Sequence, residues 1–266
     1  MRSPHCIYIL MLLLILLTTS HPSSYAQPNN KPDTTNGLTI YLTFDDGPMD
    51  GSRFIDSLVK NDSIPLEVLV TGFRIRDNVK MTAQLNSYRD EPLIEIANHS
   101  FSHANGHFRM YYSAPAEVVN DILRNENSLQ LLSRIVRLPG RNTWRIGGRK
   151  RTDLPDANAA ADSLASIGYF IFGWDLEWRY DTCENRYYSA KQMLTLVKRY
   201  RQSKKLFTPG HLVILCHDWM LPDVYFREQL SLFVKAVKST NTDRFAHLSA
   251  YPCLPWNSVT TPEHLE

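Results

Sequence analysis

Short, nearly continuous apolar runs alternate along the chain with longer amphipathic segments. The runs have the length of buried strands, and they occur at 38–44, 66–72, 93–99, 169–174 and 211–217. The segments between and after them place apolar residues at helical spacing, at 113–135, 156–168, 189–202 and 223–239. This alternation predicts parallel strands covered by helices and buried on both faces. The pattern alone fits a (β/α) barrel and an open doubly wound sheet equally well.

The first 26 residues are typical of a secretory signal peptide. Arg2 precedes an apolar run that ends at Leu17, and Ala26 follows a polar stretch with small residues where a signal peptidase cleaves. A membrane span needs about 20 apolar residues, more than this run provides, and an uncleaved anchor is the alternative. Residues 27–36 are polar and contain proline, which predicts a flexible lead-in. We therefore expect one domain over 37–266, secreted or periplasmic, with no stable membrane insertion after cleavage.

Composition narrows the range of partners. Of the 266 residues, 43% are hydrophobic, so a sizeable core is expected. The net charge is only +2 and the sequence has no dense basic tract, so nucleic acid is not an expected partner. Without Cys6, three cysteines remain, at 183, 216 and 253, which allows at most one disulfide. No C-x-x-C pair indicates a cysteine metal site, and Cys216 lies in an apolar run typical of a small buried residue.

Polar side chains gather where the predicted strands end. They are Asp45 and Asp46 after the first run, His99 and His103 at the third, Asp175 and Glu177 after the fourth, and His217 at the fifth. In α/β folds, sites form beyond the carboxyl ends of the strands. The sequence therefore predicts that these groups meet at one face.

Two of these groups point to a metal. His99 and His103, four residues apart on a helix or tight turn, would make a His₂-carboxylate set with one aspartate, the three-ligand pattern of catalytic zinc. The other aspartate would stay free as a general base beside the metal, with a cation such as Arg137 offsetting the repulsion. The alternative is structural: Asp45 caps the turn before Gly-Pro, and Asp46 is solvated.

The remaining groups complete a hydrolytic set. A histidine at the end of an apolar strand is more often a packing residue, but His217 titrates in the range of a general acid. Asp175 and Glu177 would orient His217 or Arg137. Three tryptophans lie beside these groups, at 174, 178 and 219, and they would stack on sugar rings at the rim of the site or lie in the core.

Five motifs occur together in one order: TFDDGP at 43–48, HSFSH at 99–103, RLPG at 137–140, DLEW at 175–178 and LCH at 215–217. Over about 38–219 the chain resembles the polysaccharide deacetylases of carbohydrate esterase family 4. The resemblance implies a distorted (β/α) barrel and a divalent metal, most often zinc.

The resemblance also implies a role for each matching residue. By this resemblance, Asp45 would be the base, His217 the acid and Arg137 the partner of the base, with Asp175 and Glu177 in support. The metal would be bound by Asp46, His99 and His103. The substrate would be contacted by Gly140, Leu215 and Trp178. Two motifs depart from the family pattern. Glu177 stands where an aspartate is usual, and Gly140 stands where an aromatic residue is usual.

The function expected from these residues is removal of N-acetyl groups from an amino-sugar polysaccharide or oligosaccharide, either a cell-wall glycan or a chitin-like polymer. The hydrolase would be secreted and metal-dependent. One alternative is an O-acetyl esterase acting on xylan-like material with the same site. Another is a carbohydrate-binding protein with a retired active site.

Overall fold

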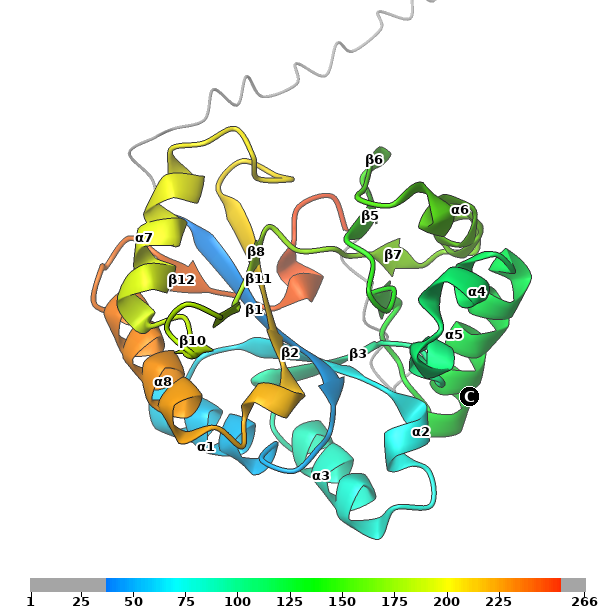
Figure 1. The fold of residues 1–266 in the computed structure, drawn as a ribbon, viewed down its shortest axis with the longest axis horizontal. Coiled ribbons are helices and arrows are strands. Elements are labelled where there is room, and N and C mark those ends of the chain that lie inside the picture. The colour runs from blue at the N-terminus through cyan, green and yellow to red at the C-terminus, as the bar shows by residue number, and fades with distance from the viewer. Residues whose placement is uncertain (1–36, 255–266) are drawn as a thin grey trace, which may run out of the picture. The chain divides into compact units, whose positions relative to one another are not determined.

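A single curled sheet of ten strands organises the fold (Figure 1). The computed structural model describes residues 37–254, which lie in one compact unit, so the predicted signal peptide and lead-in fall outside the described residues. The sheet order is β6-β5-β7-β4-β3-β2-β1-β11-β8, with β12 beside β1. The strands from β7 to β8 in this order run parallel, and β5 and β6 form an antiparallel hairpin at one edge.

The strands of this sheet are β1 Thr39–Gly47, β2 Leu66–Val70, β3 Ile94–Asn98, β4 Ile135–Val136, β5 Thr143–Ile146, β6 Arg149–Thr152, β7 Phe170–Ile171, β8 Leu176–Glu177, β11 His211–His217 and β12 Arg244–Phe245. A separate two-stranded hairpin is formed by β9 Tyr180–Asp181 and β10 Arg186–Tyr187.

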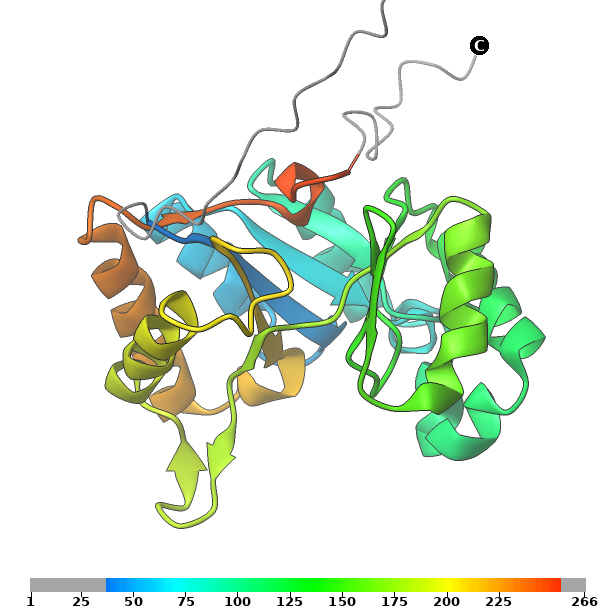
Figure 2. The ribbon, with the colours of Figure 1, turned by 90° about the horizontal axis from the view of Figure 1, so that it is seen from above.

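The helices are α1 Arg53–Asp62, α2 Gly72–Ile75, α3 Val79–Arg89, α4 Phe108–Tyr112, α5 Pro115–Leu129, α6 Asn158–Ser166, α7 Ala190–Arg201 and α8 Val224–Lys238, with short 3-10 turns η1 His103–Gly106, η2 Pro155–Ala157, η3 Asp218–Met220 and η4 Leu248–Ala250. Figure 2 shows α4, α5 and α6 gathered on the side of the β5–β6 hairpin, with α7 and α8 on the opposite side. Among the described helices, none has both the length and the apolar character needed to cross a membrane.

The predicted elements are present at their predicted places. The prediction of a distorted (β/α) barrel is confirmed. The five apolar runs coincide with β1, β2, β3, β7 and β11, and β1 continues past its run to Gly47. The helix predicted over 113–135 ends earlier, at Leu129. Gln130 takes up the left-handed conformation with φ 50°, which stops the helix and leaves Ile135 and Val136 free to form β4.

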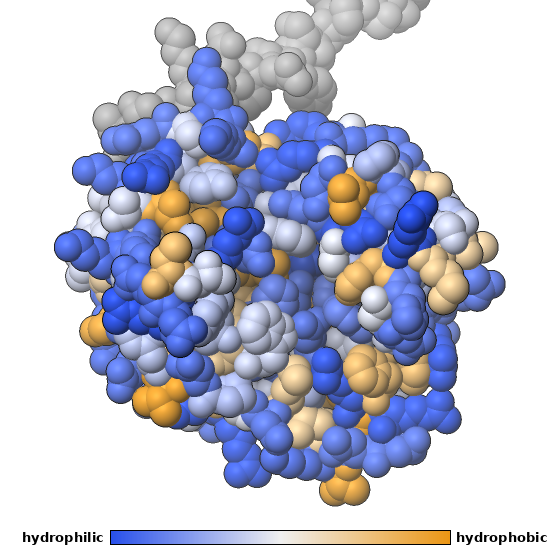
Figure 3. Space-filling view, viewed as in Figure 1, coloured by the Kyte–Doolittle hydropathy of each residue, from blue (hydrophilic) through white to orange (hydrophobic). Residues whose placement is uncertain are grey.

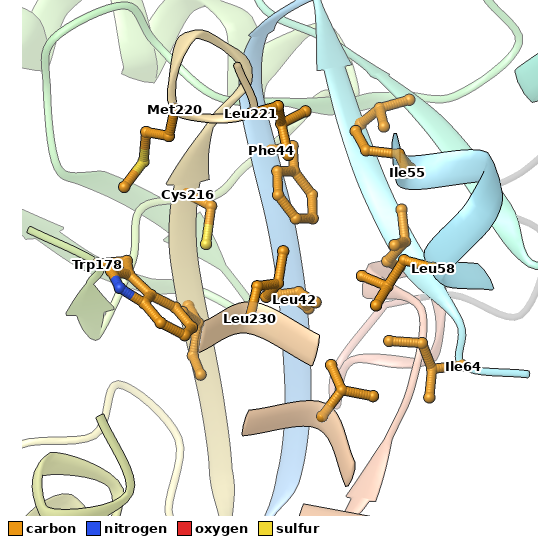
Figure 4. Packing of buried hydrophobic residues seen from close by; sticks show 14 of the residues in the cluster. Leu42, Phe44, Ile55, Leu58, Ile64, Trp178, Cys216, Met220, Leu221 and Leu230 are labelled. Carbon is orange, nitrogen blue, oxygen red and sulfur yellow. The ribbon is translucent and has the colours of Figure 1, made fainter. Parts of the chain in front are cut away.

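Successive side chains on β1 point to opposite faces, and this alternation separates two cores. Leu42 and Phe44 pack outwards against the helices, where Ile55 and Leu58 of α1 lie (Figure 4). Tyr41 points the other way, into an aromatic cluster inside the curled sheet. Polar groups on this inner face are therefore enclosed by the barrel.

The interior aromatic cluster fills the end of the barrel where the strands begin. Trp144 stacks on Phe207 with ring centroids 4.4 Å apart, and Tyr251 packs against Tyr41 and Phe172. The C-terminal segment closes this end, because β12 pairs with the first residues of β1 and Leu248 is fully buried in the same cluster. The opposite end is left for polar chemistry.

The outer surface is mostly hydrophilic on the face seen in Figure 3, with apolar residues scattered across it. The exposed large apolar side chains among the described residues come from many different elements. Such isolated residues are ordinary on a protein surface.

Candidate metal centre and active site

The end of β1 brings two carboxylates to the same histidine. Asp45 points inwards, as Tyr41 and Thr43 do, and Asp46 has φ 75°, a left-handed conformation that redirects its side chain. Both carboxylates then approach the same imidazole, since His99 Nε2 lies 3.6 Å from Asp45 Oδ2 and 3.3 Å from Asp46 Oδ1. Both side chains are almost completely buried.

A tight turn after β3 presents the two histidines. Ser100 and His103 have φ 70° and 50°, and the Ser100 hydroxyl accepts a hydrogen bond from the His103 N–H at 3.0 Å. Asn98 stabilises the start of the turn by accepting from the Ser100 N–H at 2.9 Å. His103 Nε2 lies 3.0 Å from Asp46 Oδ1. Ligand atoms of Asp46, His99 and His103 all lie within 4.8 Å of one another.

The donor chemistry of this cluster fits a cation. His99 Nδ1 lies 2.9 Å from the Arg137 carbonyl, which can only accept, so Nδ1 carries the hydrogen and Nε2 directs a lone pair towards Asp46. Asp46 Oδ1 is buried and accepts no hydrogen bond from the described residues. One carboxylate with two imidazoles is a typical zinc ligand set.

Arg137, directly after β4, is the cation predicted beside the aspartate pair. Its guanidinium is fully buried, and Nη1 donates to Asp45 Oδ1 at 2.7 Å and to Thr43 Oγ1 at 2.8 Å. Nη2 donates to the Gly173 carbonyl at 3.0 Å. The buried guanidinium compensates the charge of Asp45 and fixes its Oδ1, while Oδ2 lies near His99.

His217 ends β11 directly opposite Asp45 in the strand register. Its ring is half-buried and lies against Trp219, with centroids 5.2 Å apart. Trp219 is 47% exposed and offers a flat apolar face beside His217. Leu215 is buried two residues earlier on the same strand, in register with Thr43.

Comparison with known proteins supports the family predicted from the motifs. A family model described as polysaccharide deacetylase matches residues 32–143, the segment that contains Asp45, Asp46, both histidines and Arg137. The resemblance to the polysaccharide deacetylases is confirmed. No curated protein matches the chain.

Solved structures of this family share the fold. A carbohydrate esterase family 4 enzyme from Streptococcus mutans superposes with TM-score 0.60 at 20% identity, covering 80% of this chain and 87% of its own. The catalytic domain of a peptidoglycan N-acetylglucosamine deacetylase from Eubacterium rectale gives TM-score 0.58 at 18% identity, over 88% and 96%. A family 4 carbohydrate esterase from Streptomyces lividans gives 0.55 at 17%, over 80% and 94%.

Gly140 stands where the deacetylase pattern usually has an aromatic residue, and the ring of Phe108 lies next to it. Gly140 has φ 63°, and a Cβ placed there would lie 3.1 Å from the Phe108 ring. Phe108, from α4, meets His103 edge-on with ring centroids 5.5 Å apart. An aromatic side chain therefore adjoins Gly140 from another element. Phe108 was not among the predicted site residues, and its one local signal in the sequence is its place five residues after His103.

Trp178 is buried in the core, contrary to the prediction that it would contact substrate. It is only 1% exposed and packs edge-on against Phe226 and Phe233 of α8, while its indole N–H donates to the Tyr188 carbonyl at 2.8 Å. Its neighbourhood is the outer core between sheet and helices (Figure 4). Among the described tryptophans, Trp219 has the exposure that sugar stacking requires.

The two predicted supporting acids have other partners. Asp175 accepts from the N–H groups of Phe207 and Val213 at 2.8 and 3.1 Å and pairs with Arg151 at 3.1 Å, so it does not orient His217 or Arg137. It lies level with Val213, four residues before His217 on β11.

Glu177 binds Arg179 at 3.0 Å on a partly exposed edge, and no hydrogen bond joins it to His217 within the described part of the chain. Neither predicted acid therefore occupies its expected place. Besides the Asp45 carboxylate, the Arg137 guanidinium has the Trp174 ring beside it, 5.9 Å from ring centroid to guanidinium carbon.

Asp218 was not among the predicted site residues, yet it secures the turn that follows the aspartate pair. Its Oδ2 accepts from the Ser52 hydroxyl at 2.5 Å and from the Met49 N–H at 3.0 Å. Burial raises the pKa of Asp218 to about 7, against the opposing effect of the Ser52 hydrogen bond. The adjoining His217 was the one signal in the sequence.

Proposed function

We propose that this protein is a secreted, metal-dependent hydrolase that removes N-acetyl groups from an amino-sugar polysaccharide or oligosaccharide. The observation that carries the proposal is the pairing of two carboxylates with different surroundings. Asp46 faces His99 and His103 with an unpaired buried oxygen, and Asp45 beside it is held by Arg137. One carboxylate is thus placed as a ligand and its neighbour as a base.

Asp46, His99 and His103 would hold the metal, most plainly zinc, which would supply Lewis acidity towards the acetyl carbonyl and towards water. Asp45 takes the proton of the attacking water, and Arg137 keeps its carboxylate oriented. His217, the partner of Asp45 in the register of the adjacent strand, protonates the departing amine nitrogen. The N–H of Gly140 is the proposed donor to the oxyanion, and Leu215 is the proposed wall of the acetyl pocket.

The substrate class rests on the relatives and on the shape of the rim. The Eubacterium rectale protein is named as a peptidoglycan N-acetylglucosamine deacetylase, and a structure of a second such enzyme is also similar in fold. Trp219 would stack on a sugar ring next to His217. We therefore propose an N-acetylglucosamine-containing glycan, of cell-wall or chitin-like type, as the substrate. Secretion is proposed from the predicted signal peptide.

The test is acetate release from N-acetylglucosamine oligomers and from peptidoglycan by zinc-loaded wild type and Asp45→Asn. Asn keeps the shape of the side chain but accepts no proton, so we expect a loss of about 10²–10⁴-fold in kcat. Asp77→Asn, at an exposed carboxylate, is the matched control and should keep full activity. Equal rates for wild type and Asp45→Asn would refute the assignment of the base.

The same measurement of acetate release, with acetylated xylan added as a third substrate, separates the alternatives. An O-acetyl esterase would release acetate from acetylated xylan and none from either amide substrate. A carbohydrate-binding protein with a retired site would bind the oligomers and release no acetate from any of them with zinc present. Either result would overturn the proposed deacetylase.

A further inference from the structure

A second cluster of metal-ligating side chains lies away from the active site, where the C-terminal segment crosses the barrel. Glu67 of β2 and Glu95 of β3 are direct partners in the strand register. His247 follows β12, in the segment that closes this end. One ligand atom from each of the three residues lies within 4.8 Å of the others.

Glu67 is a buried carboxyl with little to compensate it. It is 1% exposed, and its Oε1 accepts no hydrogen bond from any described residue. Its Oε2 receives only a long bond from the Leu248 N–H, at 3.4 Å. Its direct partner in the strand register is Glu95, a second carboxyl group. Two carboxyl groups this close need a proton or a cation between them.

The nearby cation is committed elsewhere. Arg137 lies close enough for its charge to act on Glu67, but its hydrogen bonds go to Asp45, Thr43 and the carbonyls of Phe172 and Gly173. The pair must therefore be compensated by a shared proton or by a cation from outside the described residues.

We propose that Glu67, Glu95 and His247 bind a second divalent transition-metal ion. The His247 Nδ1 is buried without a hydrogen-bond partner in the described chain and lies 3.9 Å from Glu95 Oε2. Two carboxylates and one imidazole suit zinc, manganese or cobalt. Ser249 orients Glu95 by donating its hydroxyl to Oε1 at 2.5 Å, as supporting residues do for metal-binding carboxylates.

This ion would be structural. It would join β2 and β3 to the C-terminal segment, whose Leu248 and Tyr251 pack inside the barrel. Entry from solvent is open, since the side chains of Glu95 and His247 are 21% and 20% exposed. The proposal does not depend on the proposed deacetylase activity, because an ion here lies away from Asp46, His99 and His103.

The experiment counts bound metal in a protein that lacks the first site. His99→Ala/His103→Ala is stripped with chelator, dialysed and titrated with Zn²⁺ by calorimetry, and with Co²⁺ by visible absorption. We expect one equivalent of Zn²⁺ to bind and to raise the Tm. Adding Glu67→Gln, or separately His247→Ala, should abolish both effects, whereas adding Glu228→Gln at an exposed position should change neither.

Two results would contradict the second metal site. If His99→Ala/His103→Ala has a native near-ultraviolet circular dichroism spectrum and binds no Zn²⁺, then Glu67 and Glu95 share a proton instead and the proposal is wrong. Binding that survives both Glu67→Gln and His247→Ala would place the ion elsewhere and would equally overturn it. His247→Ala, at a partly exposed residue, keeps the test valid should Glu67→Gln fail to fold.

Discussion

The buried carboxyl of Asp218 makes the stability of this protein depend on pH. Its side chain is enclosed beneath the turn that follows β1, where Ser52 and Met49 donate to it and Gly47 packs against it. Burial raises its pKa to about 7 in the folded protein. In the unfolded chain an aspartate has a pKa of about 3.9.

The sign follows from which state holds the proton. Below about pH 4 both states are protonated, and the group contributes its full stability. Between about pH 4 and pH 7 the unfolded chain releases its proton and the folded protein keeps it, so the free energy of unfolding falls as pH rises. A difference of about three pKa units corresponds to about 4 kcal/mol lost across this window.

Asp218→Asn removes the titration and keeps a carbonyl oxygen that can accept from the Met49 N–H. From pH 4 to pH 8 we expect the unfolding free energy of the variant to rise, relative to wild type, by up to about 4 kcal/mol. Urea denaturation at several pH values measures this, with chelator present so that metal binding does not contribute. Asp77→Asn is the control. Parallel pH profiles for wild type and Asp218→Asn would refute the reasoning.

Three further predictions concern the site and its surroundings. Arg137→Met should destabilise the fold by about 3–5 kcal/mol in urea denaturation, because Asp45 is left buried and unpaired, and by much less in an Asp45→Asn background; additive losses would contradict the pairing. Trp178→Ala should cost about 3–5 kcal/mol of stability with KM for oligosaccharide unchanged, while Trp219→Ala should raise KM with little change in stability; the reverse pattern would contradict their assignment. His217→Ala should reduce amide cleavage more than cleavage of an acetyl ester, which has the better leaving group, and equal losses would argue against a general acid.

The groups at the strand ends were predictable because their geometry follows from the strands themselves. The carboxyl ends of parallel strands lie at one edge of the sheet. Asp45, His99 and His217 therefore lie at that edge, independently of the conformation of the loops. The run of apolar residues before each of them marks the strand and its end. Asp45 and Asp46 turn towards different partners, Arg137 and the two histidines, at the point where the strand ends in Gly47-Pro48.

The errors came from register and from packing between distant segments. Asp175 lies level with Val213 on β11, well before His217, and no local pattern states that offset. Trp178 follows β8 and turns towards Phe226 and Phe233, which lie some 50 residues later in α8. Tertiary contacts of this kind decide which of the neighbouring tryptophans is buried. They join residues far apart in the chain, so the local sequence pattern does not predict them.

The central claim is that Asp46, His99 and His103 form a metal centre on which deacetylation depends. The most direct measurement is the rate of acetate release from N-acetylglucosamine oligomers by chelator-treated protein, before and after zinc is restored. The account predicts no release after chelation, recovery with zinc in wild type, and no recovery in His103→Ala. Undiminished release after chelation, or full activity of zinc-loaded His103→Ala, would contradict it.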